Sequence, residues 1–225
     1  MLNSDLDIDK CSFCGKLFIP SSYSEWKSEN NETINIPEYD DVYILAELKK
    51  GEFYICEECY KKLDIANYSE TEQYEIHFQF GIEYNNHQQY HNSILSYEKA
   101  RLLKNSSELL RYIAQCYAKL DQTDLELNLM NEAYLLDKTN PDVLREFAAT
   151  LNINKYYLKA LKILEEFIEL KPFTDNEYMI KAEALYKLGK VKEAKLAFEN
   201  ALLINDCPSC IKANSEIWKA LIKGN

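Results

Sequence analysis

The chain has 225 residues, of which 47% are hydrophobic, and this fraction is ample for packed cores. Its formal net charge is −11, which works against broad binding to the phosphate backbone of nucleic acids, because such binding needs clustered lysine and arginine. Only five glycines occur, and they are scattered, so the chain has no glycine-rich loop of the kind that holds a nucleotide phosphate. The first ten residues, MLNSDLDIDK, have neither a basic start nor an apolar run, and no later stretch reaches the roughly 18 apolar residues of a membrane span. We therefore expect a cytoplasmic protein whose main partner is neither nucleic acid nor membrane.

Four cysteines near the start of the chain form two Cys-x2-Cys pairs, Cys11 with Cys14 and Cys56 with Cys59. A two-residue spacer lets both sulfurs of a pair reach one metal ion at about 2.3 Å, and two pairs complete a tetrahedral Zn2+ site. A site closed by four sulfurs has no open position for a substrate, so the predicted Zn2+ is structural. The alternative is a redox-switched site, in which oxidation of the thiolates releases the metal.

The residues around the second pair predict a small α+β unit. Residues 42–56 contain two apolar and aromatic runs separated by a polar turn that ends at Gly51, which is typical of a β-hairpin. Residues 57–63 favour a helix with Cys59 in its first turn. A knuckle, a hairpin and a helix that carries the second ligand pair follow each other in the order of a treble-clef zinc finger. We assign this unit to residues 1–68, with an acidic insert at 21–41.

The two knuckles, CSFCGK at 11–16 and YICEEC at 54–59, resemble the C4-type zinc-binding domain of the ClpX protein unfoldase. The resemblance implies a module that binds adaptor and client proteins, that forms homodimers, and that is linked to a proteolysis or chaperone system. The chain departs from that family in the insert between the knuckles, and repeats at 69–225 stand in place of an ATPase module.

The rest of the chain, 69–225, is repetitive, with a period of about 34 residues. A small residue is followed three positions later by a large one in each predicted first helix: Gly81 and Tyr84, Ala114 and Tyr117, Ala148 and Leu151, Ala182 and Leu185. This pattern resembles the tetratricopeptide repeat (TPR), a helix-turn-helix unit of about that length. The resemblance implies a mainly α fold, a right-handed α-solenoid of about four TPR helix pairs at about 74–106, 107–140, 141–174 and 175–208.

Two features depart from or extend this repeat pattern. Glu126 and Phe167 stand where the pattern has a small residue, so we expect the packing to differ there. Residues 209–224, which include Trp218, predict a capping helix that covers the apolar face of the last repeat.

The TPR resemblance implies a groove lined mainly by the first helices of the pairs, where extended peptides or helices of other proteins bind. The repeat register collects four cations along this groove, and they favour an acidic peptide or a terminal carboxylate as its ligand: Arg111, Lys119, Arg145 and Lys187. The opposite interpretation is a solvated helix face with scattered charges. A further hypothesis is that the acidic segment 24–41 folds back on the groove. The repeat register places the following side chains on or near it: Phe78, Ile82, Asn85, Arg111, Gln115, Lys119, Arg145, Asn152, Met179, Tyr186 and Lys187.

The remaining cysteines and histidines predict no catalytic site. Cys207 and Cys210 form a third pair, but two ligands do not close a tetrahedral site, so we consider packing cysteines, a redox dithiol or a metal shared across a dimer interface. His87 and His91 are four residues apart but straddle a predicted turn. No glutamate stands beside them in the arrangement of a metalloprotease.

The sequence therefore predicts a non-catalytic adaptor or scaffold that recognises proteins or peptides through the groove and the zinc module. Two alternatives remain open at this point. One is a zinc- or thiol-based redox-sensing regulator or holdase chaperone. The other is a zinc-dependent nucleic-acid-binding regulator, which would need a basic face that residues 1–68 lack.

Overall fold

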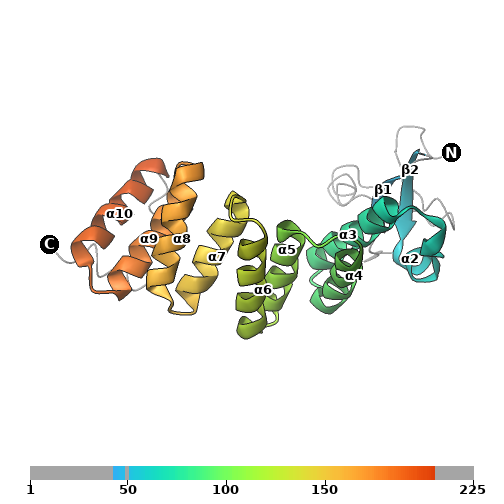
Figure 1. Cartoon of the computed structure of the whole chain (residues 1–225), viewed down its shortest axis with the longest axis horizontal. Coiled ribbons are helices and arrows are strands. Elements are labelled where there is room, and N and C mark those ends of the chain that lie inside the picture. Colours follow the sequence, from blue (N-terminus) through green and yellow to red (C-terminus); the bar gives the residue numbers. More distant parts are fainter. Residues whose placement is uncertain (1–42, 49–50, 206–225) are drawn as a thin grey trace, which may run out of the picture. The chain divides into compact units, whose positions relative to one another are not determined.

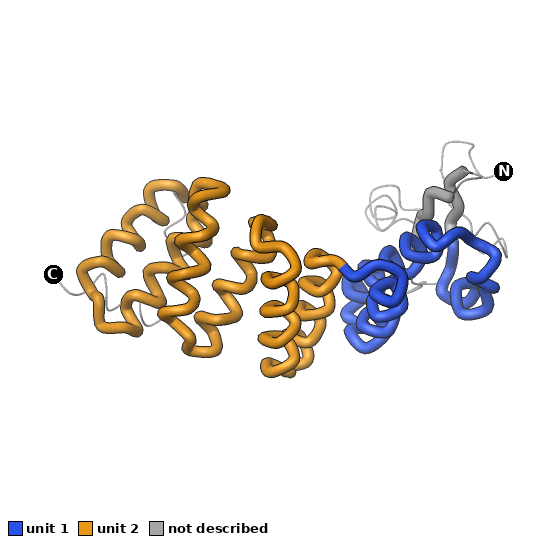
Figure 2. The backbone as a smooth tube through the Cα atoms, in the orientation of Figure 1, with its two compact units in different colours: residues 1–105 blue, residues 106–225 orange. Residues whose placement is uncertain are grey.

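The structure is a computed structural model that describes residues 43–48 and 51–205 (Figure 1). The chain divides into two compact units, Met1–Asn105 and Ser106–Asn225 (Figure 2). The predicted zinc ligands Cys11 and Cys14, the insert 21–41, the pair Cys207 and Cys210, and the predicted capping helix at 209–224 lie outside the described residues.

The first unit begins with the predicted β-hairpin and helix. Strands β1 (Tyr43–Leu48) and β2 (Gly51–Cys56) pair antiparallel, with Tyr43 opposite Cys56 and Leu48 opposite Gly51. Strand β2 runs directly into helix α2 (Glu57–Lys62), and the 3-10 turn η1 (Ile65–Asn67) follows.

Four helix pairs follow along the chain, as the repeat pattern predicts. The first helix of each pair is called the A helix here and the second the B helix. Within the second unit each helix packs on the next, and the A helices α5, α7 and α9 also touch one another in sequence (Figure 1). The pairs are α3 (Glu70–Asn86) with α4 (Tyr90–Leu103), α5 (Ser107–Lys119) with α6 (Thr123–Leu136), α7 (Pro141–Ile153) with α8 (Tyr157–Leu170), and α9 (Asp175–Lys187) with α10 (Val191–Ile204).

Every A helix ends in the same tight turn. After α7, Lys155 adopts the left-handed conformation with φ 65°, and the amide of Tyr156 donates a 2.8 Å hydrogen bond to the carbonyl of Leu151. This bond, together with one from the Lys155 amide to the Asn152 carbonyl, is the Schellman pattern of helix termination. The left-handed residues of the four turns occupy the same position in successive repeats: Gln88, Asp121, Lys155 and Gly189.

In the first helix pair a small residue of the A helix fits against a large residue of the B helix. In the first pair a Cβ atom added to Gly81 would overlap the ring of Tyr97, which is completely buried. Ser93 on the same B helix donates a 2.7 Å hydrogen bond to the Gly81 carbonyl. The first pair therefore needs glycine at this position, where the later pairs have buried alanines.

Glu126 and Phe167, which stand where the repeat pattern has a small residue, make contacts that a small residue could not make. Glu126 accepts a 2.7 Å hydrogen bond from the Thr150 hydroxyl of α7, so the carboxylate replaces an apolar contact with a polar one. Phe167 is completely buried, with its ring centroid 5.9 Å from that of Phe173.

The core of the first unit joins the hairpin and α2 to the first helix pair. The Tyr60 ring stacks on Phe80 at 3.9 Å, and its hydroxyl is hydrogen-bonded to Nδ1 of His77 at 2.8 Å. Burial, together with the charge of Lys99, lowers the pKa of His77 to about 4, so the imidazole is neutral at pH 7. Ile55, Ile76 and Tyr84 complete this core. This core contains residues from both sides of residue 68, where the sequence predicts a domain boundary. The domain boundary at residue 68 therefore stays a prediction.

Replacing Lys155 with glycine should stabilise the second unit by about 0.5–1 kcal/mol, because glycine adopts the left-handed conformation without a steric cost. Gly189→Ala is the matched opposite change. No atom of the described residues lies within 4 Å of the added Cβ, so only the backbone cost applies, and we expect a loss of about 1 kcal/mol. Urea unfolding followed by circular dichroism measures the change in the free energy of unfolding for both variants. A destabilised Lys155→Gly variant would contradict this account of the turn.

Candidate protein-binding surface

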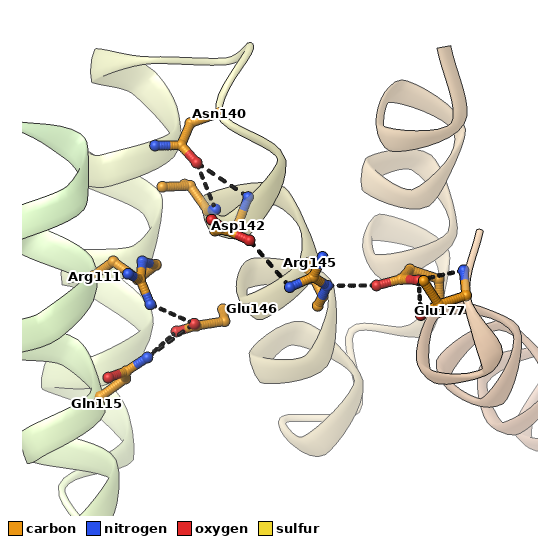
Figure 3. Close-up of polar contacts among 9 residues, drawn as sticks. Arg111, Gln115, Asn140, Asp142, Arg145, Glu146 and Glu177 are labelled. Carbon is orange, nitrogen blue, oxygen red and sulfur yellow. Dashed lines mark hydrogen bonds and ion pairs between the residues drawn. The ribbon is translucent and has the colours of Figure 1, made fainter. Parts of the chain in front are cut away.

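Polar side chains connect the A helices α5, α7 and α9 across successive repeats (Figure 3). Each connection joins side chains that are 31 to 35 residues apart in sequence, so each one links a repeat to the next. We call this set the A-helix ladder. Its members are Arg111, Gln115, Arg145, Glu146, Asn152, Glu177 and Glu183.

The first connection joins α5 to α7. The Arg111 guanidinium, with a side chain 12% exposed, donates a 2.7 Å hydrogen bond from Nη1 to Glu146. Gln115 donates from Nε2 to both oxygens of the same carboxylate, at 2.8 and 2.7 Å. Burial alone would lower the pKa of Arg111, but the Glu146 charge and hydrogen bond outweigh it and raise that pKa. Arg111 is therefore a charged side chain that the chain itself neutralises.

The second connection joins α7 to α9. Arg145 donates from Nε to Glu177 at 2.5 Å and from Nη1 to Asp142 at 3.0 Å. Glu177 is completely buried and also accepts hydrogen bonds from the backbone amide and the hydroxyl of Thr174 at the start of α9. Burial would raise the pKa of Glu177, but the bonds from Thr174 and Arg145 more than offset it and hold that pKa below its usual value.

The third connection is a carboxamide bond between the same two helices. Asn152 is buried and donates a 2.8 Å hydrogen bond from Nδ2 to Glu183. Its Oδ1 and the Nε of Arg111 are buried atoms with no hydrogen-bond partner among the described residues. Buried polar atoms are almost always paired with protein or water, so these two mark positions where the ladder is not fully satisfied.

The other predicted groove residues have different environments. Lys119 and Lys187 are exposed in the last turns of α5 and α9. Tyr186 and Met179 pack partly buried against the core of the last helix pair. In the first unit, Phe78, Ile82 and Asn85 are half-buried on α3.

The structure changes the basis for predicting an acidic ligand on the A helices. Two of the four cations that supported that prediction, Arg111 and Arg145, are bound to carboxylates of the chain. An acidic partner for this face therefore stays a prediction that depends on Lys119 and Lys187.

Sequence reasoning did not find the acidic members of the ladder, Glu146, Glu177 and Glu183. A detectable signal exists, because each of them follows a basic or amide residue by about one repeat length. Glu177 carries a second signal, since the equivalent positions in the three preceding repeats are the buried apolar residues Ile76, Leu109 and Val143.

The described half of the predicted zinc site lies where β2 meets α2. Cys56 is the N-cap of α2 and is 1% exposed, whereas Cys59 is half-buried in the first turn and packs against the core of the first unit. Within residues 43–48 and 51–205, no group of three or more His, Cys, Asp or Glu side chains could hold a metal ion. None of the helices that the structure describes is long and apolar enough to cross a membrane.

Comparisons with known proteins agree with this architecture. No family model matches the sequence. The TPR repeat-containing protein MJ1428 of Methanocaldococcus jannaschii is 32% identical over 114 residues, which cover 50% of this chain but only 18% of that protein. The crystal structure of MamA superposes with a TM-score of 0.55 at 18% identity, over 68% of this chain and 95% of MamA. The chain has the tetratricopeptide-repeat fold.

Other solved structures show a similar likeness. YrrB, a TPR protein with an unusual peptide-binding site, superposes with a TM-score of 0.55 at 17% identity, over 60% of this chain and 71% of YrrB. MamA from Desulfovibrio magneticus RS-1 superposes with a TM-score of 0.56 at 15% identity, over 60% of this chain and 76% of that protein. The fold predicted for the repeats is therefore confirmed.

Removing the carboxylate of Glu146 should destabilise the second unit, because Arg111 would remain largely buried without its counter-charge. We expect Glu146→Ala to cost about 1–3 kcal/mol in the free energy of unfolding. Glu165→Ala, at an exposed glutamate of α8, is the control and should change it by less than about 0.5 kcal/mol. If the two substitutions lowered the free energy of unfolding equally in urea, the connection between Arg111 and Glu146 would contribute nothing to stability.

Proposed function

We propose that this chain is a non-catalytic scaffold that binds protein or peptide partners through its TPR-like helix pairs. The observation that carries the proposal is the A-helix ladder. Its bonds fix α5, α7 and α9 in register, so the side chains between them are held in place before any partner arrives. A preorganised surface loses less conformational entropy on binding than a mobile one.

We call the surface that carries the A-helix ladder together with Lys119 and Lys187 the A-helix face, and it has groups suited to recognising a peptide. Gln115 is half-buried and its Nε2 is engaged with Glu146, but its carboxamide oxygen can accept a hydrogen bond from an amide of an extended backbone. Lys119 and Lys187 supply exposed positive charge near the ends of their helices. YrrB, which shares the fold, has a peptide-binding site, and this likeness also supports a peptide or protein as the partner.

We further propose that Cys11, Cys14, Cys56 and Cys59 hold one structural Zn2+. The placement of Cys56 and Cys59 at the junction of a β-hairpin and a helix supports this site, because a treble-clef finger carries its second ligand pair there. Four thiolates in a reducing cytoplasm suit Zn2+, and the metal would stabilise the fold of residues 1–68. The resemblance to the ClpX zinc-binding domain adds the proposals of a homodimer and of a link to a proteolysis or chaperone system.

The A-helix face can be tested with a charge-reversal variant, Lys119→Glu/Lys187→Glu. Affinity purification from the native cell, followed by quantitative mass spectrometry, should recover a partner with the wild type at least about tenfold better than with this variant. Lys171→Glu/Lys192→Glu makes the same change of charge at exposed positions after α8 and on α10, and should leave recovery unchanged. If no protein is enriched by the wild type, the scaffold proposal fails.

The zinc proposal predicts one Zn2+ per chain in protein prepared with zinc. Cys59→Ser should lose the metal and lower the thermal midpoint of the first unit, since metal binding contributes to folding free energy. Cys116→Ser, at a buried cysteine of α5 in the second unit, is the control and should keep its zinc. Elemental analysis gives the ratio of metal to chain. Full zinc content in Cys59→Ser would remove that residue from the ligand set.

A further inference from the structure

A groove in the second unit is lined by residues of the B helices α6 and α8 and of the A helix α7 between them in the chain. It has a volume of about 490 Å³. We call it the B-helix groove, and it differs from the A-helix face in position and in composition. The lining residues that matter for its chemistry are Asn128, Asn131, Phe147, Leu151, Lys159 and Lys162.

The charge of the B-helix groove is positive and is not balanced locally. Lys159 and Lys162 are exposed one turn apart on α8, and none of the described residues that line the groove is a carboxylate. Neither lysine forms an ion pair with any residue in the described part of the chain, although the Lys159 ammonium lies 5.2 Å from the centroid of the Tyr156 ring. Unbalanced positive charge stands out in a chain whose net charge is −11.

Two carboxamides face the same groove from α6. Asn128 and Asn131 are exposed, lie one turn apart, and make no hydrogen bond to another residue that the structure describes. A carboxamide can donate to a peptide carbonyl and accept from a peptide amide at the same time. Phe147 and Leu151 of α7 also line the groove but are only 5% and 3% exposed, whereas the Tyr156 side chain that lines it is 46% exposed.

One end of the groove is held in place by the chain itself. Tyr134, in the last turn of α6, donates a 2.8 Å hydrogen bond to Glu166 of α8. The Tyr134 ring also packs on Phe147, with centroids 5.5 Å apart. The width of the groove is therefore fixed by contacts between α6, α7 and α8, and Glu166 is engaged with Tyr134 and not with the lysines.

The equivalent groove one repeat later lacks this chemistry. It lies between α8 and α10, has a volume of about 200 Å³, and is lined mostly by the equivalent residues of the next repeat. At these positions Phe147 is replaced by Lys181 and Lys159 by Glu193. Lys190 of that groove pairs with Glu193 at 3.5 Å. The unpaired lysines and free amides are thus a property of the B-helix groove and do not follow from the repeat fold.

We propose that the B-helix groove binds an extended segment of a partner protein in which acidic side chains flank a large apolar one. The apolar side chain would pack on the exposed ring of Tyr156 and on the edges of Phe147 and Leu151. The carboxylates would pair with Lys159 and Lys162, and Asn128 and Asn131 would bond to the peptide backbone. This site is separate from the A-helix face, so it adds a second surface to the scaffold.

The test uses a synthetic hexapeptide of alternating glutamate and leucine, with both ends blocked so that only side-chain carboxylates are present. Titrated into the 15N-labelled full chain and followed by NMR, it should shift the side-chain amide signals of Asn128 and Asn131. The binding should weaken as salt is raised. The matching peptide of glutamine and leucine should bind at least about tenfold more weakly, a loss of about 1.4 kcal/mol.

Two charge-matched variants decide where the peptide binds. Lys159→Glu/Lys162→Glu should weaken binding at least about tenfold, whereas Lys119→Glu/Lys187→Glu on the A helices should change it less than about twofold. If the A-helix variant weakened binding and the B-helix variant did not, the proposal that the B-helix groove binds the peptide would be wrong, and the scaffold proposal would stand. No shift at either face, or a dimer of the free protein that Lys159→Glu/Lys162→Glu dissolves, would also overturn the inference, the latter because a second copy would then occupy the groove.

Discussion

The left-handed turn that ends each A helix is the constraint on which the rest of the structure depends. It reverses the direction of the chain between the two helices of a pair, and it recurs at Gln88, Asp121, Lys155 and Gly189. Because successive turns are one repeat length apart, equivalent side chains of successive repeats lie beside one another within the second unit. The A-helix ladder and the B-helix groove both arise from this spacing, on opposite members of the helix pairs.

The distribution of charge explains how an acidic chain can offer distinct surfaces. On the A helices its carboxylates are used internally, since Glu146 and Glu177 hold Arg111 and Arg145. Removing one partner of a buried pair leaves an uncompensated charge, so these bonds favour one register of neighbouring repeats. Between α6 and α8 the groove lining includes lysines and asparagines, with no carboxylate among the lining residues that the structure describes, and its lysines are exposed to solvent.

The sequence predicted the helix pairs because their packing is a property of the repeat itself. Gly81 with Tyr97 is one example, where a small residue and a large one meet within a single helix pair. The sequence also placed Arg111 and Arg145 on the A-helix face, but it did not show what they contact. Their partners lie 35 and 32 residues away, off the exact repeat period, and the choice depends on the reach of long side chains across two helices. The burial of Glu177 was missed because its own neighbours in the sequence do not show it; the signal lies in the apolar residues at the equivalent positions of the preceding repeats, such as Leu109 and Val143.

The central claim is that the second unit presents fixed surfaces to protein partners, and site-specific photo-crosslinking in the native cell tests it most directly. A photoreactive residue would be placed at Ala149, one helical turn after Arg145 on α7, at Asn131 in the B-helix groove, and at the exposed Glu199 of α10 as a control. The account predicts protein adducts of defined mass from Ala149 and Asn131, with the Asn131 adduct lost in the Lys159→Glu/Lys162→Glu background. Equal adduct yields at all three positions, or no adduct at either surface, would contradict it.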